Sequence, residues 1–288
     1  MGRLPSAPLT RKAIVDTTAW NQLNIAYPGD DSAERERHAA EHLGGILPAA
    51  EASGLITSWW FIRKGPWRVR YLLASPPSSS DSDPIHASLT AGMAWTRDIY
   101  EPETHALGGP ASMDLAHTLF HHDSSHLLSF LRSGAADRRE RSLILCTALM
   151  RAAGLDINEQ GDVWAQVAEH RASVPVAPVD ADVWSSFTDD ISHILRGRAG
   201  TDVLDRTWLT AFEDAGRALR TLRAEGALTR GLRAITALHV IFHWNRIGLP
   251  ATTQAALARA AKDAIFGRPI DEIRSERPAS AGSSSKAR

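Results

Sequence analysis

Two arginines, Arg68 and Arg70, stand two residues apart in a short apolar segment and are the first candidates for chemistry. Side chains two apart share one face of a β-strand, so both guanidinium groups are expected on one face, with Trp67 and the other apolar alternates on the opposite one. Paired cations there could bind substrate carbonyls or a peptide carboxylate. Two arginines on a solvated sheet face are the alternative. Arg63, at the end of the preceding apolar segment, either joins this patch or flanks the turn.

A second group of candidates precedes a Gly-Gly-Pro break at 108–110. Tyr100, Glu103 and His105 fall in this segment, and loops at such breaks often carry functional side chains. Glu103 could transfer a proton or accept a hydrogen bond, and Tyr100 could supply a phenol. An ordinary loop carboxylate and a packing tyrosine are the alternatives.

A third group lies in an apolar segment near the C-terminus. His239, His243 and Arg246 are spaced by four and three residues, which places them on one stripe of a helix, while Asn245 faces elsewhere. A histidine in so apolar a helix is either an acid–base group or a core residue with hydrogen-bonded nitrogens.

Four further histidines, at 117, 121, 122 and 126, contain two pairs at helical spacing. A catalytic zinc site needs a third ligand and a general base, and neither pair encloses a glutamate. The sequence therefore predicts no metal site. It also lacks a glycine-rich phosphate loop, so no cofactor is expected. Asp123 and Ser124 are expected to end or cap a helix.

Composition excludes several classes of protein. The 288 residues carry a net charge of -1, with 43% hydrophobic and 23% charged residues, so there is no basic field for nucleic acid. The single cysteine, Cys146, lies in an apolar run and is expected to be a buried, inert thiol. Because no signal segment or membrane span is recognisable, we expect a soluble cytoplasmic protein that binds no membrane.

The elements that must position these residues indicate an α+β fold: a small, mostly antiparallel sheet packed with a helix-rich C-terminal half. A β-hairpin is predicted from 59–63 and 67–73, around a Lys-Gly-Pro turn, and a loop from 76–84. The region 171–180 is a linker or an edge strand. Helices are predicted at 32–53, 112–132, 138–153, 159–171, 182–196, 204–224, 228–246 and 251–266. We expect a flexible N-terminus (1–19), one domain (20–268) and a disordered tail (269–288).

Four ordered segments carry a family resemblance. They are Trp20–Gly29, the hairpin Trp59–Arg70, Tyr100–Ser124 with its Gly-Gly-Pro break, and Leu238–Gly248. In this order they resemble the thiopeptide-type bacteriocin biosynthesis domain, which is also the C-terminal domain of lantibiotic dehydratases. The resemblance covers about residues 20–265, and it implies that 20–268 is one catalytic domain of this type.

In the dehydratases, the domain eliminates glutamate from glutamylated Ser or Thr. Elimination enzymes carry a His-x-Arg-x-Arg strand, a Glu-x-x-Arg-Tyr-Gly-Gly segment and a histidine four residues before an Asn-Arg pair. The matching residues kept here are Arg68, Arg70, Glu103 and the pair Asn245-Arg246. The arginine, the tyrosine and the late histidine fall on Ala106, Leu107 and Ile241. Without that arginine and that histidine, elimination chemistry is disfavoured.

The resemblance then favours the stand-alone form of the domain, the thiopeptide pyridine synthase. That enzyme joins two dehydroalanines of a ribosomally made thiazolyl peptide in a formal [4+2] aza-cycloaddition, with loss of water and expulsion of the leader peptide. Positioning is its main requirement, and the nine tryptophans are expected to cradle the thiazoles. Two alternatives stay open: a split glutamate-elimination lyase, and a non-catalytic subunit that binds the leader peptide.

The resemblance also implies partners and roles. The expected partner is a precursor peptide with a leader and a dehydrated thiazolyl core; the split dehydratase proteins of the same pathway are further candidates. The residues expected in catalysis are Arg68, Arg70, Tyr100, Glu103 and His243. The residues expected to bind substrate are Arg63, Trp67, His105, His239, Asn245 and Arg246.

Overall fold

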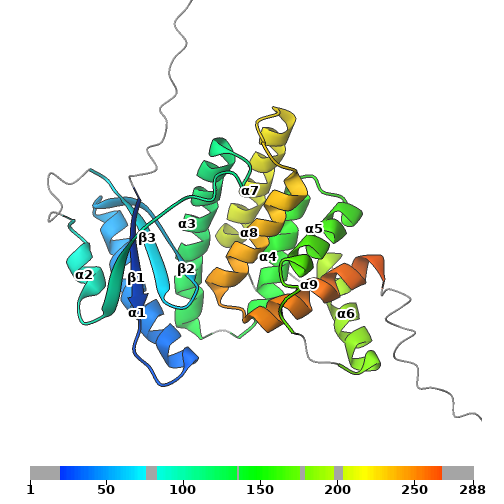
Figure 1. Cartoon of the computed structure of the whole chain (residues 1–288), viewed down its shortest axis with the longest axis horizontal. Helices are drawn as coiled ribbons and strands as arrows, with labels where there is room; N and C mark the ends of the chain where they lie inside the picture. Colours follow the sequence, from blue (N-terminus) through cyan, green and yellow to red (C-terminus); the bar gives the residue numbers. More distant parts are fainter. Residues whose placement is uncertain (1–19, 76–82, 135, 176–178, 198–203, 268–288) are drawn as a thin grey trace, which may run out of the picture.

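The computed structural model describes residues 20–75, 83–134, 136–175, 179–197 and 204–267 (Figure 1). The N-terminal elements are β1 (Trp20–Ala26), α1 (Ser32–Ala52), β2 (Ile56–Arg63), β3 (Trp67–Leu73), α2 (His86–Thr90) and β4 (Ala94–Ile99). The helices that follow are α3 (Pro110–Ser133), α4 (Arg138–Ala152), α5 (Ile157–Glu169), α6 (Ala181–Leu195), α7 (Arg206–Ala224), α8 (Leu232–Ile247) and α9 (Ala251–Phe266).

The four strands form one sheet in the order β2-β3-β1-β4, and every neighbouring pair is antiparallel. The β2–β3 hairpin turns at Gly65, whose positive φ of 74° suits a residue without a Cβ. The small sheet and the helical C-terminal half together confirm the predicted α+β class (Figure 1).

Helix α1 covers the sheet face that carries Trp59 and Trp67. The Trp59 indole Nε1 donates to Glu51 of α1 at 2.8 Å. Tyr27, which follows β1, packs edge-on against Trp67 and bonds through its hydroxyl to His42 of α1 at 3.0 Å. On β2 and β3 this face of the sheet is therefore core.

The two edges of the sheet differ. Edge strand β2 is sealed by α3: the Phe61 N–H donates to Ser124 Oγ at 3.2 Å, and His121 Nδ1 lies 2.9 Å from the Trp59 carbonyl oxygen. These contacts satisfy backbone groups that an edge strand otherwise leaves open. Edge strand β4 pairs only with β1 among the described elements, and all six of its residues are exposed.

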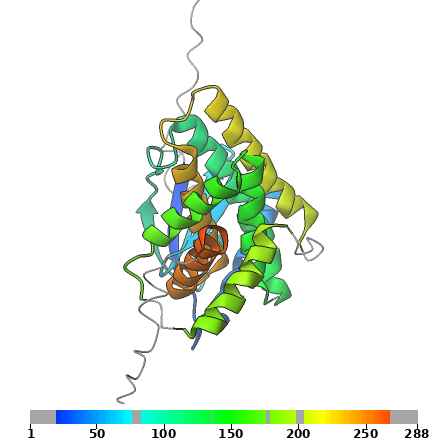
Figure 2. The same ribbon diagram turned by 90° about the vertical axis from the view of Figure 1, so that its right-hand side faces the viewer.

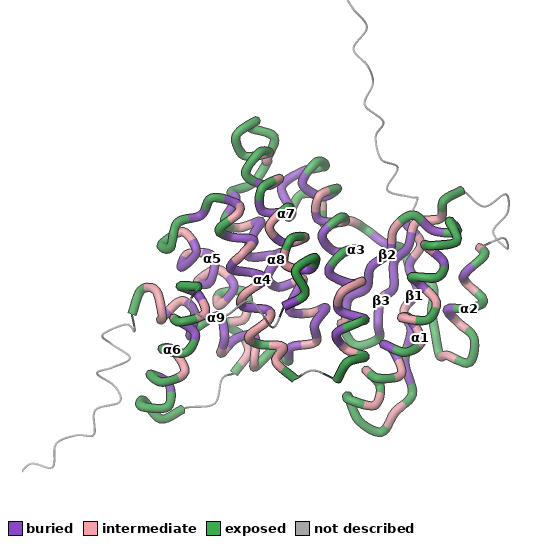
Figure 3. The backbone as a smooth tube through the Cα atoms, turned by 180° about the vertical axis from the view of Figure 1, so that it is seen from behind, coloured by how far each residue is buried: buried purple, intermediate pink, exposed green. Residues whose placement is uncertain are grey.

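Helix α3 is shared by both layers of the fold. It packs against α1 and β2 on the sheet side and against α7 and α8 on the helical side. Figure 2 faces the helical half, and Figure 3 shows the buried positions running through α3, α4 and α8. The described helices are each too short or too polar to span a bilayer.

The predicted hairpin and helices correspond to observed elements, with ends displaced by up to four residues. Strands β1 and β4 and the short helix α2 were not predicted. The Asp123 prediction was wrong, because α3 continues to Ser133 and Asp123 is wholly buried within it. The described part of 171–180 contains no strand. The expected termini (1–19 and 269–288), residues 76–82 of the predicted loop and residues 176–178 of the predicted linker lie outside the described residues.

Candidate active site

The sheet face opposite α1 carries a polar array across all four strands. Register aligns one row as Trp60, Arg70, Gln22 and Asp98, and the next row as Ile62, Arg68, Asn24 and Thr96. Arg68 and Arg70 therefore share a face, as predicted, and the alternating Trp67, Val69 and Tyr71 are buried on the other. Hydrogen bonds hold the array together: the Gln22 amide donates to Asp98 at 2.9 Å within the first row, and the Asn24 amide donates to Asp98 at 3.2 Å between the rows.

Arg70 is the buried centre of this array, with only 7% of its surface exposed. Its Nε donates to Gln22 Oε1 at 2.6 Å. Its guanidinium lies over the rings of Trp60 and Tyr100, at 4.2 and 4.3 Å from their centroids. Burial lowers the pKa of Arg70 to about 10, so the group is still a cation at neutral pH. The two rings and the Gln22 bond therefore hold this positive charge in a fixed orientation.

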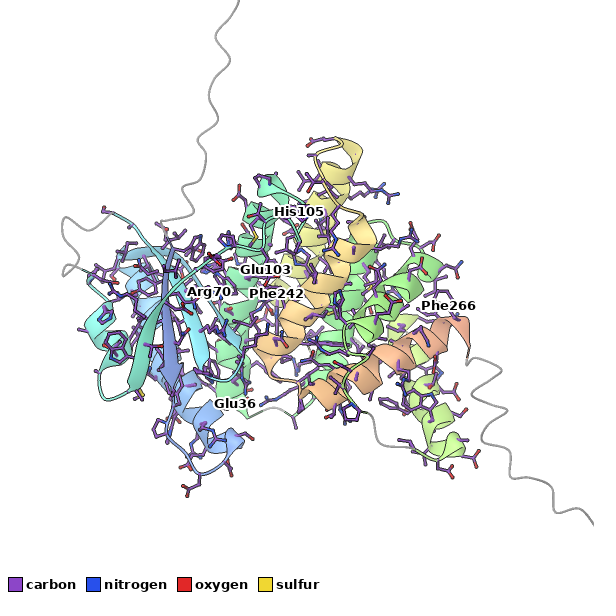
Figure 4. All side chains as sticks on the ribbon, viewed as in Figure 1. Glu36, Arg70, Glu103, His105, Phe242 and Phe266 are labelled. Carbon is purple, nitrogen blue, oxygen red and sulfur yellow. The ribbon has the colours of Figure 1, made fainter. Side chains whose placement is uncertain are left out.

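Arg68 and Glu103 extend the array towards solvent. Arg68 is half-buried and Glu103 is exposed, and both act electrostatically on Arg70. In Figure 4, Arg70 and Glu103 lie where the sheet meets the helical half, and His105, also exposed, lies further along the same segment. Cation and carboxylate here can polarise a carbonyl and exchange a proton.

Buried Tyr100 and half-buried His117 form a pair beside Arg70. The Tyr100 hydroxyl lies 2.8 Å from His117 Nε2 of α3. Burial, with a smaller effect from Arg70, lowers the pKa of His117 to about 4, so the imidazole is neutral at pH 7. Burial raises the pKa of Tyr100, so its phenol keeps its proton. The pair can hold a proton at the hydroxyl or pass it between the two rings.

The two glycines of the Gly-Gly-Pro break place this segment. Gly108 and Gly109 have φ values of 91° and 107°, a region that residues with a Cβ rarely adopt. A Cβ on Gly108 would meet Ile235 of α8 at 2.4 Å. The Gly108 carbonyl accepts from the Thr229 N–H at 3.0 Å. Close approach to the start of α8 therefore fixes the segment from Tyr100 to His105.

The late-helix residues form a separate, wholly buried cluster around Asp123. Asp123 accepts from Arg246 Nε at 2.7 Å and from Trp208 Nε1 at 2.9 Å, and it bonds His243 Nδ1 at 2.9 Å. Burial would raise the pKa of Asp123, but the charges of His243 and Arg246 outweigh it and lower the pKa to about 2. The structure thus places His243 and Arg246 in the core and not beside Arg68.

Phe120 connects this cluster to the polar array. Its ring lies 4.8 Å from that of Trp60, 5.0 Å from that of Phe242, and 4.3 Å from the Arg246 guanidinium carbon. His239 is also buried, its ring 6.0 Å from Phe120, and neither of its nitrogens has a hydrogen-bond partner among the described residues. The Asp123 cluster and the polar array are therefore linked by side-chain packing.

Arg63, Trp67 and Asn245 line a different pocket of about 520 Å³. Arg63 pairs with Glu36 of α1, and its guanidinium lies 4.8 Å from the centre of the Trp67 ring. Asn245 Oδ1 accepts from the Gln254 amide at 3.1 Å. Arg63 thus flanks the turn and does not join the polar array. Nine of the eleven predicted site residues therefore fall into three groups, the polar array with its loop, the Asp123 cluster and this pocket, while His105 and His239 lie outside them.

Most of the tryptophans are structural, and the histidines belong to no metal-binding cluster among the described residues. Eight of the nine tryptophans are buried, while Trp95 is 40% exposed, so they do not form the open wall expected for a peptide site. No cluster of three metal-ligating side chains occurs among the described residues. Cys146 is buried, and burial raises the pKa of its thiol.

Several residues of the site were missed in the sequence. Gln22 and Asn24 alternate with Leu23 and Ile25, a strand signal that was readable but not used. Asp98 gave no local signal, because it joins the array only through the register of β4 with β1. His117 was considered only as a zinc ligand.

The fold is shared with three solved structures. The dehydratase titled "tRNA dependent lantibiotic dehydratase MibB from Microbispora sp. 107891" aligns with a TM-score of 0.58 and 19% identity, over 95% of this chain and 29% of that chain. The structure titled TsrL gives 0.59 and 18%, over 90% and 99%. The pyridine synthase TbtD from thiomuracin biosynthesis gives 0.51 and 14%, over 85% and 97%. At these identities the likeness shows the fold alone.

This chain spans less than a third of the length of MibB and nearly the whole length of TsrL and TbtD. No curated protein matches it. The family model described as "Lantibiotic biosynthesis dehydratase C-term" matches residues 20–265, the region over which the sequence motifs run. With most of its 288 residues matched, this chain belongs to the lantibiotic dehydratase C-terminal family.

Proposed function

We propose that this chain forms the central pyridine of a thiopeptide by joining two dehydroalanines of a ribosomally made thiazolyl peptide. One observation carries the proposal. The polar array keeps two arginines and an acidic loop residue, whereas the positions at which elimination enzymes carry a further arginine and a histidine hold Ala106 and Ile241. Ile241 is buried and its side chain has no group that could transfer a proton.

The chemistry asks for an amide that tautomerises to a 2-azadiene and for two alkenes held close together. The fixed guanidinium of Arg70, with Arg68 beside it, is suited to polarising the amide oxygen and steadying the iminol. Glu103 is suited to taking the amide proton, and Tyr100, backed by neutral His117, to donating one when water or leader peptide leaves.

The buried residues of α8 take positioning roles in this proposal. His243 and Arg246 fix the orientation of α8 through Asp123, and Phe120 transmits that packing to Trp60 beneath Arg70. Holding reactants in a near-attack geometry can lower a barrier by about 7–11 kcal/mol. Rigid support of the residues that position the substrate would therefore contribute to catalysis.

Mass spectrometry tests the proposal directly. Purified protein is mixed with a dehydrated thiazolyl precursor peptide and, separately, with a peptide that carries glutamylated Ser. Release of the leader as an amide with a matching loss of water supports the cyclase. Loss of glutamate from the second peptide overturns it in favour of the elimination lyase. No mass change in either, with tight leader binding, overturns both catalytic readings. An Arg70→Gln variant controls for contaminating enzymes.

A further inference from the structure

The two edges of the sheet are treated differently by this fold. On β2, side chains of α3 bond the exposed backbone groups, as His121 does at Trp59 and Ser124 at Phe61. On β4, no other described element provides such a contact: the outer backbone bond that the structure shows is from the Ile99 N–H to the adjacent Asp98 side chain.

The sequence of β4 protects this edge only in part. Natural edge strands are commonly blunted by charged side chains, lysine above all, by proline, by a bulge or by a covering element. Ala94–Ile99 contains two charged residues, Arg97 and Asp98, but no lysine or proline, and it pairs with β1 in unbroken register over all six residues. In an antiparallel edge strand, alternate residues direct their N–H and C=O groups away from the sheet, so β4 presents a ready ladder for another extended chain.

The exposed side chains of β4 add a specific pattern. Trp95 and Ile99 are exposed by 40% and 84% and share one face of the strand, with Arg97 between them. Trp95 is the exposed tryptophan of the nine. A chain paired here gains apolar contacts at two alternate positions and an ion pair at the position between them. An extended segment with an apolar–acidic–apolar alternation fits this face.

The edge strand β4 lies next to the candidate active site. Asp98 and Thr96 of β4 bond Gln22 and Asn24, the neighbours of Arg70 and Arg68. The chain then passes from Ile99 directly into Tyr100. A peptide paired along β4 would therefore have one end beside the polar array.

We propose that β4 binds an extended segment of the precursor peptide's leader as a fifth strand of the sheet, with the core peptide led from there to Arg68 and Arg70. The identity of this partner rests on the proposed function. The recognition itself follows from the open edge, because main-chain pairing supplies affinity and the alternate side chains supply selectivity.

The first test measures where the leader binds. The probe is the fluorescently labelled leader of the precursor peptide used in the mass-spectrometry test. Ile99→Asp is expected to raise the Kd for this leader at least tenfold and to raise KM for the full precursor with kcat unchanged. Val183→Asp, at a site 59% exposed on α6, is the matched control and is expected to change neither. An unchanged Kd in Ile99→Asp overturns the proposal.

The second test measures the pairing itself. Leaders with single N-methylated amides are expected to bind weakly at every second position of one segment, because only alternate N–H groups face the edge. The outward-facing amides of β4, which do not bond to β1, are expected to exchange hydrogen for deuterium rapidly in the free protein and slowly with leader bound. Affinity losses without a two-residue period, or outward-facing β4 amides that are already slow in the free protein, overturn the proposal; the latter result would mean that this chain or a second copy occupies the edge.

These measurements separate the two proposals. Leader binding at β4 without pyridine formation would leave the edge site standing and remove the cyclase. Pyridine formation with no change in the hydrogen exchange of the β4 amides would leave the cyclase standing and remove the edge site.

Discussion

The Tyr100 hydroxyl lies 2.8 Å from Nε2 of His117, beneath a face of the sheet that also holds Arg70. A second tyrosine–histidine pair, Tyr27 with His42 at 3.0 Å, occurs near the opposite face of the sheet. The same tyrosine–histidine hydrogen bond thus occurs both beside the polar array and away from it, so the second pair serves as a control for the first.

Tyr100→Phe keeps the ring that stacks on Arg70 and removes only the hydroxyl. If this phenol donates a proton in the rate-limiting step, pyridine formation should fall about 100-fold or more, the usual range for one acid–base group. Tyr27→Phe should leave the rate within about twofold. The rate of product formation by mass spectrometry checks this, and equal effects of the two changes would remove Tyr100 from the mechanism.

Arg70→Lys tests whether orientation, beyond charge, matters at the centre of the polar array. Lysine keeps the cation but loses the guanidinium contacts with the two rings and the Nε bond to Gln22. A buried Gln22 oxygen left unpaired costs about 1–3 kcal/mol of unfolding free energy. We expect that loss together with at least a tenfold fall in turnover. Arg68→Lys, at a half-buried site, should keep full stability in a denaturant titration.

Asp123→Asn tests the buried cluster. Removing one charge from a wholly buried ion pair costs about 3–5 kcal/mol, because the Arg246 guanidinium is left uncompensated. Asp214→Asn breaks an Arg217 pair whose aspartate side chain is 65% exposed, and it should cost under about 1 kcal/mol. Chemical denaturation at pH 7 measures both. A small loss in Asp123→Asn would mean that His243 and Arg246 find other partners.

Because His239 is buried, we expect the free energy of unfolding to fall in acid. Burial, with a contribution from Arg246, lowers its pKa from 6.5 to about 3. Between these values the unfolded chain binds a proton that the folded chain does not, so stability falls as pH falls, by on the order of 1 kcal/mol per pH unit. His239→Leu should flatten this dependence between pH 6.5 and 3, although His117 keeps part of it. His170→Ala, at an exposed site, should not. Thermal unfolding across this pH range decides the matter.

The hairpin and the long helices were predictable because their apolar periodicity is local. Strand β4 was not, since all six of its residues are exposed and no alternation marks it. The shared orientation of Arg68 and Arg70 followed from strand geometry alone. Their partners did not: Gln22 and Asp98 are 76 residues apart in sequence, and only tertiary packing sets their register.

The position of His243 shows a second limit. Its spacing from His239 and Arg246 correctly placed the three on one stripe of α8. Helix α8 is apolar on nearly every side, with twelve of its residues buried. Such a helix gives no amphipathic direction from which to infer which stripe faces solvent. The buried aspartate that defines the stripe's environment comes from α3, 120 residues earlier.

Helix α3 belongs to the hydrophobic interior of both layers, and this has a consequence for how the molecule melts. A fragment that ended after α3 would expose the surface that meets α7 and α8, and one that began after it would lose the wall that holds Asp123. Neither half has a complete core of its own. We therefore expect the calorimetric and van't Hoff enthalpies of unfolding to agree, as they do when a protein loses its structure in a single all-or-none step.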